Sequence, residues 1–96
     1  MTLSESQKVI DEVMKGIAVF SNLEASEIGI DDNLEEDLYL NIPTDLPAII
    51  SSVAKELEIE MQTESVSEFM KQALKDPEEA TVSSLVALFE EEVEFN

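Results

Sequence analysis

The chain has 96 residues, of which 23 are Asp or Glu and five are Lys or Arg, so its formal net charge is −18. Nucleic-acid binding depends on cations that displace counterions from phosphates, and adsorption to an anionic membrane surface depends on cations too. The charge therefore argues against nucleic acid and membrane as partners. The chain contains neither cysteine nor histidine, so it lacks the usual ligands of zinc and the usual base of catalytic triads. We expect a protein that is not an enzyme, with no catalytic residue and no metal site.

Hydrophobic residues make up 44% of the chain, which is too many for a disordered acidic tail. The length fits a single domain over residues 1–96, and two glycines with three prolines leave little turn chemistry for a β-rich fold. The first residues show no signal peptide, and no apolar stretch approaches the length of a bilayer. We expect an all-α, cytoplasmic protein, and nothing in the sequence demands an oligomer.

The hydrophobic spacing predicts four amphipathic helices. In the first, the apolar residues between Val9 and Ile17 recur at helical spacing, and Ser4 with Gln7 offers a capping box at its start. A long connection follows, from about residue 21 to residue 44, and such connections usually carry function. We expect it to be an ordered loop because apolar residues that must be buried recur through it: Leu23, Ile28, Ile30, Leu34, Leu38, Leu40 and Ile42.

The second helix is expected to begin near Thr44 or Asp45, with one of these side chains as N-cap and Pro47 in the first turn. Its predicted apolar face consists of Leu46, Ile49, Ile50, Val53 and Leu57.

The third helix is expected to start at Ser65, which forms a capping-box pattern with Glu68, and to end at Asp76, because proline follows. The fourth opens at Thr81, and the acids Glu90–Glu92 are expected on its solvated side. The predicted apolar face of the third helix is Val66, Phe69, Met70, Ala73 and Leu74, and that of the fourth is Val82, Leu85, Val86, Phe89 and Val93.

Three segments carry a resemblance to a known family. Residues 27–38 read Glu-Ile-Gly-Ile-Asp-Asp-Asn-Leu-Glu-Glu-Asp-Leu, residues 53–61 read Val-Ala-Lys-Glu-Leu-Glu-Ile-Glu-Met, and Thr81-Val82 opens the last predicted helix. In this order and spacing they resemble the acyl carrier proteins of fatty-acid and polyketide synthesis. The resemblance implies a small four-helix bundle with a long ordered loop between helices 1 and 2. It also implies an extended helix 3, because the segment between Met61 and Thr81 is longer than this family usually needs.

The sequence departs from the family at the point of modification. In the family, an Asp-Ser-Leu motif lies at the place that follows residues 37–40 of this chain, and its serine receives the phosphopantetheine arm. In this chain, residues 41–43 at that place are Asn-Ile-Pro. The nearest hydroxyl belongs to Thr44, for which an N-cap is the simpler interpretation. We therefore expect no cofactor, and phosphopantetheine enters only if Thr44 is the modified residue.

The acids expected to dock on a partner are Asp37 in the loop and Asp45, Glu56 and Glu58, the last three of which match the family's docking positions along the second helix. Much of the remaining charge lies in the loop between Asp31 and Asp37, which lacks the glycine and glutamate of a calcium-binding EF-hand loop. A solvated acidic loop is the simpler interpretation of that cluster.

Three functional hypotheses follow. The first is an armless, acyl-carrier-protein-like protein that docks on a partner protein with a basic surface through electrostatic steering. The second is a working carrier in fatty-acid, polyketide or related biosynthesis, modified at Thr44. The third is an acidic adaptor, chaperone or inhibitor that is unrelated to carriers.

Overall fold

The structure, a computed structural model, describes residues 2–95 of the chain, and the side chains of residues 7–94. Four α-helices account for most of this span, and no β-strand occurs in it; Asn33 and Thr81 form an isolated β-bridge. The expectation of an all-α fold with four helices is confirmed. The helices are α1 (Thr2–Ser21), α2 (Ile42–Leu57), α3 (Thr63–Lys75) and α4 (Val82–Phe95), with short 3-10 turns at Ala25–Glu27 and Pro77–Glu79.

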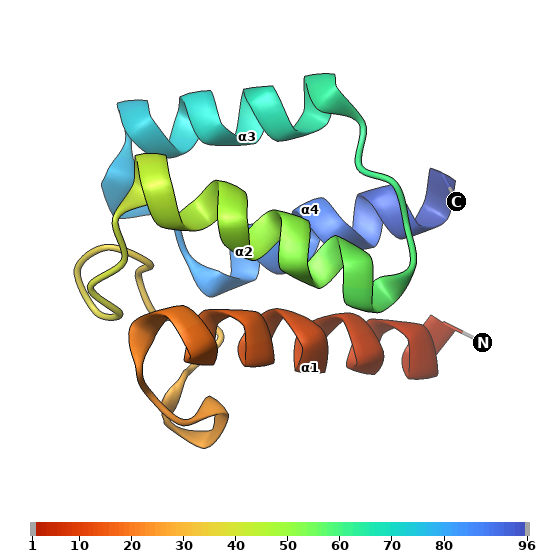
Figure 1. Ribbon diagram of the computed structural model, residues 1–96, viewed down its shortest axis with the longest axis horizontal. Coiled ribbons are helices and arrows are strands. Elements are labelled where there is room, and N and C mark those ends of the chain that lie inside the picture. The colour runs from red at the N-terminus through yellow and green to blue at the C-terminus, as the bar shows by residue number, and fades with distance from the viewer. Residues whose placement is uncertain (1, 96) are drawn as a thin grey trace.

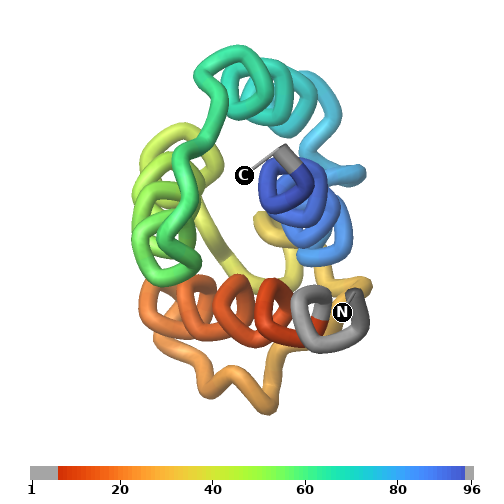
Figure 2. The backbone as a smooth tube through the Cα atoms, turned by 90° about the vertical axis from the view of Figure 1, so that its right-hand side faces the viewer, coloured from red at the N-terminus to blue at the C-terminus, as the bar shows by residue number. Residues whose placement is uncertain are grey.

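The four helices pack around one core (Figures 1 and 2). Helix α1 contacts both α2 and α4, and α3 covers α2 and α4 on the side away from α1. Within the described span, no helix combines the length and the apolar character needed to cross a membrane.

The predicted apolar faces of α1, α2 and α4 are confirmed, since their central residues are buried in a shared cluster. The predicted face of α3 is only partly correct. Ala73 is its one buried residue among those described, and Leu74 is 52% exposed. Because α3 packs less closely against α2 and α4 than α1 does, much of its apolar surface stays accessible.

The start of α4 agrees with the prediction. Thr81 Oγ1 accepts a hydrogen bond from the Ser84 N–H at 3.2 Å, and Ser84 Oγ accepts one from the Thr81 N–H at 3.0 Å. This reciprocal pair satisfies two backbone donors that the helix itself leaves free. Helix α3 ends at Lys75, directly before Asp76-Pro77, as the proline predicts.

The predicted starts of α1 and α3 are wrong. Helix α1 is already helical at Thr2, so Ser4 lies inside it, and the predicted Ser4 capping contact lies outside the described side chains. Helix α3 begins at Thr63 after Gln62, two residues before Ser65. The cause is tertiary: Glu92 Oε1, on α4, accepts a hydrogen bond from the Gln62 N–H at 2.9 Å.

The expectation that Glu92 lies on a solvated face is therefore wrong as well. Its side chain is 0% exposed, whereas the neighbouring Glu91 is exposed. A buried carboxylate is stable only where hydrogen-bond donors replace water. Glu92 meets this requirement in part through the Gln62 N–H and so fixes the start of α3 against α4.

The connection between α1 and α2 is an ordered loop, as predicted. Its backbone is tied to the start of α4: the Leu34 N–H donates to the Ala80 carbonyl at 2.8 Å, and the Ser83 N–H donates to the Ile30 carbonyl at 2.8 Å. Most of its apolar residues are buried, but Ile30 is exposed, contrary to the expectation.

The side chain of Asn33 holds this loop in place. It is 7% exposed. Its Nδ2 donates to the carbonyls of Pro77 and Glu78 at 2.9 and 3.0 Å, and its Oδ1 accepts from the N–H groups of Glu35 and Glu36 at 2.9 and 2.8 Å. One buried amide thus satisfies four backbone groups from two distant segments.

Gly16 allows α1 and α2 to approach closely, because a Cβ at this position would lie 2.7 Å from Val53 Cγ2. We expect Gly16→Ala to lower the free energy of unfolding by about 1–2 kcal/mol, since overpacking against the stiff, buried Val53 outweighs the gain of about 1 kcal/mol in helix propensity. Urea unfolding measures this. In a Val53→Ala background the same change should become stabilising, and a destabilisation of equal size there would contradict the proposed contact.

Candidate functional site

Helix α2 begins earlier than predicted. Asn41 is the N-cap residue in an extended conformation, with φ −92° and ψ 106°, and the helix starts at Ile42. The Asn41 carbonyl accepts the N–H groups of Thr44 and Asp45 at 3.2 and 2.7 Å, and Asp45 Oδ2 accepts the Asn41 N–H at 2.8 Å. Pro43 fits here because the first turn needs no N–H from it.

The prediction that Thr44 or Asp45 is the N-cap is therefore wrong, and Pro47 lies in the helix interior rather than in the first turn. Ile42, one of the three residues at the place where the family has its modified serine, is 1% exposed and belongs to the core. Pro43 and Thr44 are exposed beside it. The nearest exposed hydroxyl thus lies within the first turn of α2, two residues after the point where the helix starts.

The four predicted docking acids do not form one cluster. Asp37 and Asp45 lie near the start of α2, and both accept local hydrogen bonds. Asp37 Oδ2 accepts the Asn33 N–H at 2.7 Å, and Asp45 Oδ2 accepts the Asn41 N–H at 2.8 Å. Glu56 and Glu58 are exposed at the other end of α2. At 1.5 Å per residue, Asp45 and Glu56 are about 16 Å apart along the helix.

The acidic loop before α2 uses some of its carboxylates to shape itself. Asp32 Oδ2 accepts the Gly29 N–H at 2.8 Å, and Asp37 accepts the Asn33 N–H. Among the residues that the structure describes, no three acidic side chains are grouped so that they could hold a metal ion. Tyr39 follows these acids three residues before α2 begins, with φ 57° and a side chain that is 86% exposed.

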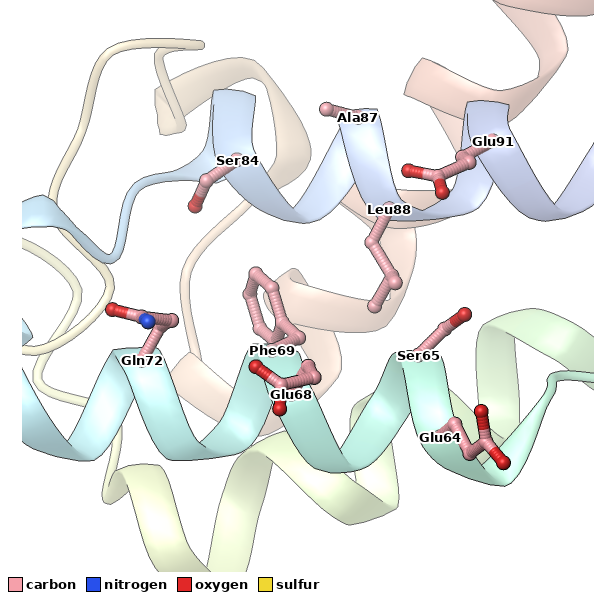
Figure 3. A pocket seen from close by; sticks show the side chains of 9 residues that line it. All are labelled: Glu64, Ser65, Glu68, Phe69, Gln72, Ser84, Ala87, Leu88 and Glu91. Carbon is pink, nitrogen blue, oxygen red and sulfur yellow. The ribbon is translucent and has the colours of Figure 1, made fainter.

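A groove that the sequence did not predict lies between α3 and α4 (Figure 3). It has a volume of about 530 Å³. Phe69 from α3 and Leu88 from α4 point toward one another and form its apolar part. Its other lining residues are small or polar: Glu64, Ser65, Glu68, Gln72, Ser84, Ala87 and Glu91.

The sequence predicts that Phe69 lies on the buried face of its helix and that Glu68 forms a capping box with Ser65, and it predicts no role for Glu64. The signal that could have located the groove is the pair Glu64 and Glu68, which lie one turn apart on the same side of the helix, together with Phe69, which follows Glu68 in the sequence. The second wall, however, comes from α4, and its placement depends on tertiary packing.

Comparisons with known proteins found no similar protein. No protein-family model, no curated protein and no solved structure matches this chain.

The surface charge leads to a testable prediction about stability. Exposed acids occur on each of the four helices and in the loop before α2, and 23 acidic residues against five basic ones give the chain a net charge of −18. Mutual repulsion opposes the folded state, and salt screens it, since the Debye length is about 30 Å at 0.01 M and about 8 Å at 0.15 M. We expect the melting temperature to rise by about 5 °C over this range. A melting temperature that is constant or falls in salt, measured by circular dichroism, would contradict this.

Proposed function

We propose that this chain is an acidic, non-catalytic protein of the acyl-carrier-protein type that docks on a partner protein and carries no phosphopantetheine arm. The observation that carries the proposal is the start of α2. Where the family has its serine, this chain has Asn41, Ile42 and Pro43, none of which carries a hydroxyl, and Ile42 is buried in the core. A phosphodiester cannot form at that residue.

The order of the elements supports the carrier-type part of the proposal. A first helix, a long packed loop, a second helix, a connecting helix and a last helix opened by Thr81-Val82 are the arrangement that the resemblance implies. The loop is tied to the start of α4 by backbone hydrogen bonds, which is unlike a free acidic linker.

The charge supports the docking part. An exposed surface rich in Glu and Asp attracts a basic partner and speeds its association, and salt weakens this attraction. The proposed protein acts in the cytoplasm as a monomer, has neither nucleic acid nor membrane as a partner, and needs no cofactor.

The experiment is an intact-mass measurement after incubation with coenzyme A and a promiscuous phosphopantetheinyl transferase, with an ordinary acyl carrier protein as positive control. We expect the mass to stay unchanged, because no primary hydroxyl lies at the start of α2. A gain equal to one phosphopantetheine arm would overturn the armless part of the proposal.

The second candidate is a working carrier modified at Thr44, and the exposure of Thr44 in the first turn of α2 favours it. If the mass does increase, Thr44→Val separates the two explanations. Loss of the modification in this variant assigns it to Thr44. Persistence would move it to another hydroxyl, such as the exposed Ser51 or Ser52.

A further inference from the structure

We propose that the groove between α3 and α4 binds a basic amphipathic helix of the partner protein. The inference rests on the proposed function, because it gives a place and a chemistry to the docking that this function requires. It moves the binding surface away from α2, where the resemblance to carrier proteins would put it.

The apolar part of the groove provides a binding site for a hydrophobic side chain. Leu88 is almost fully buried at its base, Phe69 is half-buried beside it, and the exposed Ala87 leaves room above α4. Figure 3 shows Phe69 and Leu88 facing one another between the two helices. A leucine or phenylalanine of a partner that entered here would lose its contact with water and cover the exposed part of Phe69.

The rim of the groove selects the charge of the occupant. Glu64 and Glu68 line it from α3 and Glu91 lines it from α4, all three are exposed, and no lysine is among the lining residues. Lys or Arg side chains that flank an apolar residue would meet a carboxylate on each side. A second copy of this chain is a poor occupant, because its own acids would face these acids.

The length of the groove fits a helix. Its lining residues extend from Glu64 to Gln72 on α3, which is about 12 Å at 1.5 Å per residue, or roughly two helical turns. An amphipathic helix presents apolar residues at i, i+3, i+4 and i+7 over such a distance, with basic residues on both sides of the apolar stripe.

The exposed side of α2 offers a weaker match to the same partner. It carries Pro43, Pro47, Ser51 and Ser52, and the cation of Lys55 would repel a basic helix. The exposed acid Glu56 of α2 lines a smaller pocket of about 240 Å³ together with Glu12 of α1, but Lys15 also lines that pocket and would repel a basic helix. The α3–α4 groove has acids on both walls and no lysine among its lining residues.

The probe for the test is a fluorescein-labelled peptide of about 14 Leu and Lys residues, ordered so that the leucines form one helical face. A scrambled peptide of the same composition serves as the charge control. Fluorescence anisotropy at about 0.15 M salt gives the Kd of each peptide for the full chain, because screening at this strength limits nonspecific attraction. We expect the amphipathic peptide to bind about tenfold more tightly than the scrambled one.

Two double variants of equal charge change locate the site. Glu68→Lys with Glu91→Lys reverses one acid on each wall of the groove, and Glu56→Lys with Glu58→Lys reverses two exposed acids at the end of α2. We expect the groove variant to weaken binding of the amphipathic peptide about tenfold and the α2 variant to weaken it less than threefold. Circular dichroism verifies that both variants remain folded.

Each outcome is decisive. A loss confined to the groove variant supports the proposal, and so do amide chemical-shift changes along α3 and α4 on titration with the peptide. An equal loss in both variants, or a loss confined to the α2 variant, overturns the groove while leaving partner docking intact. Equal affinity for the two peptides overturns the helix as occupant. Failure of the proposed function appears separately, as a mass increase in the transferase assay.

Discussion

Replacing Asn33 with alanine is expected to lower the free energy of unfolding by about 3 kcal/mol. The substitution removes two donors to the carbonyls of Pro77 and Glu78 and one acceptor that serves two N–H groups. Water can reach only part of this site, since Asn33 is almost fully buried, and each buried group left without a partner costs about 1–3 kcal/mol. Such a loss is large against the 5–15 kcal/mol that stabilise a typical domain.

Urea unfolding followed by circular dichroism measures the change. Asn33→Asp is the matched variant, because it keeps the acceptor oxygen but places a carboxylate against two carbonyls; it should also destabilise the fold. Asp31→Ala, an exposed neighbour in the same loop, should alter stability by less than about 0.5 kcal/mol. An Asn33→Ala protein as stable as the Asp31→Ala control would show that the loop does not depend on this amide.

The second large effect is expected for Glu92→Ala, with a loss of about 2–3 kcal/mol in the free energy of unfolding. The change leaves a cavity at a fully buried position and takes the acceptor from the Gln62 N–H. Relief of the cost of burying a carboxylate offsets part of the loss. Because Gln62 precedes α3, the start of this helix should also fray, so its amide protons should exchange faster with solvent.

Glu94→Ala is the control, since Glu94 is an exposed acid on the same helix. Removing it reduces repulsion and should leave stability unchanged or slightly raised. The assignment of a structural role to Glu92 would be wrong if both variants had the same unfolding midpoint and the same exchange rates in α3.

The sequence was sufficient to predict the helices that form the core. Apolar residues such as Leu46, Ile49 and Val53 recur at the helical period, and burial of such a face is the main source of helix stability in proteins. The ordered loop was predictable for a similar reason, because residues such as Leu34 and Leu38 could not remain exposed in it.

The starts of the helices were harder to predict, since distant residues decide them. Local capping patterns pointed to Ser65, but the acceptor that fixes the beginning of α3 is Glu92, 30 positions away in the sequence. Likewise, Glu91 and Glu92 are the same residue type side by side, but Glu91 is exposed and Glu92 is buried. Only the packing of α4 decides which of them is buried. The groove next to Glu91 was unpredictable in the same way, because its walls come from two helices.

The bonds of Asn33 also have a consequence for how the chain reaches its folded state. The two carbonyls that accept from this amide lie 44 and 45 positions later in the sequence, so a chain that emerges from the ribosome exposes the loop's leucines before the segment that holds them has been made. Contacts of such long range slow folding and leave apolar surface open to aggregation. A fragment that stops before Pro77 should therefore aggregate more readily than the full chain. Adding the missing segment as a separate peptide should restore an ordered loop.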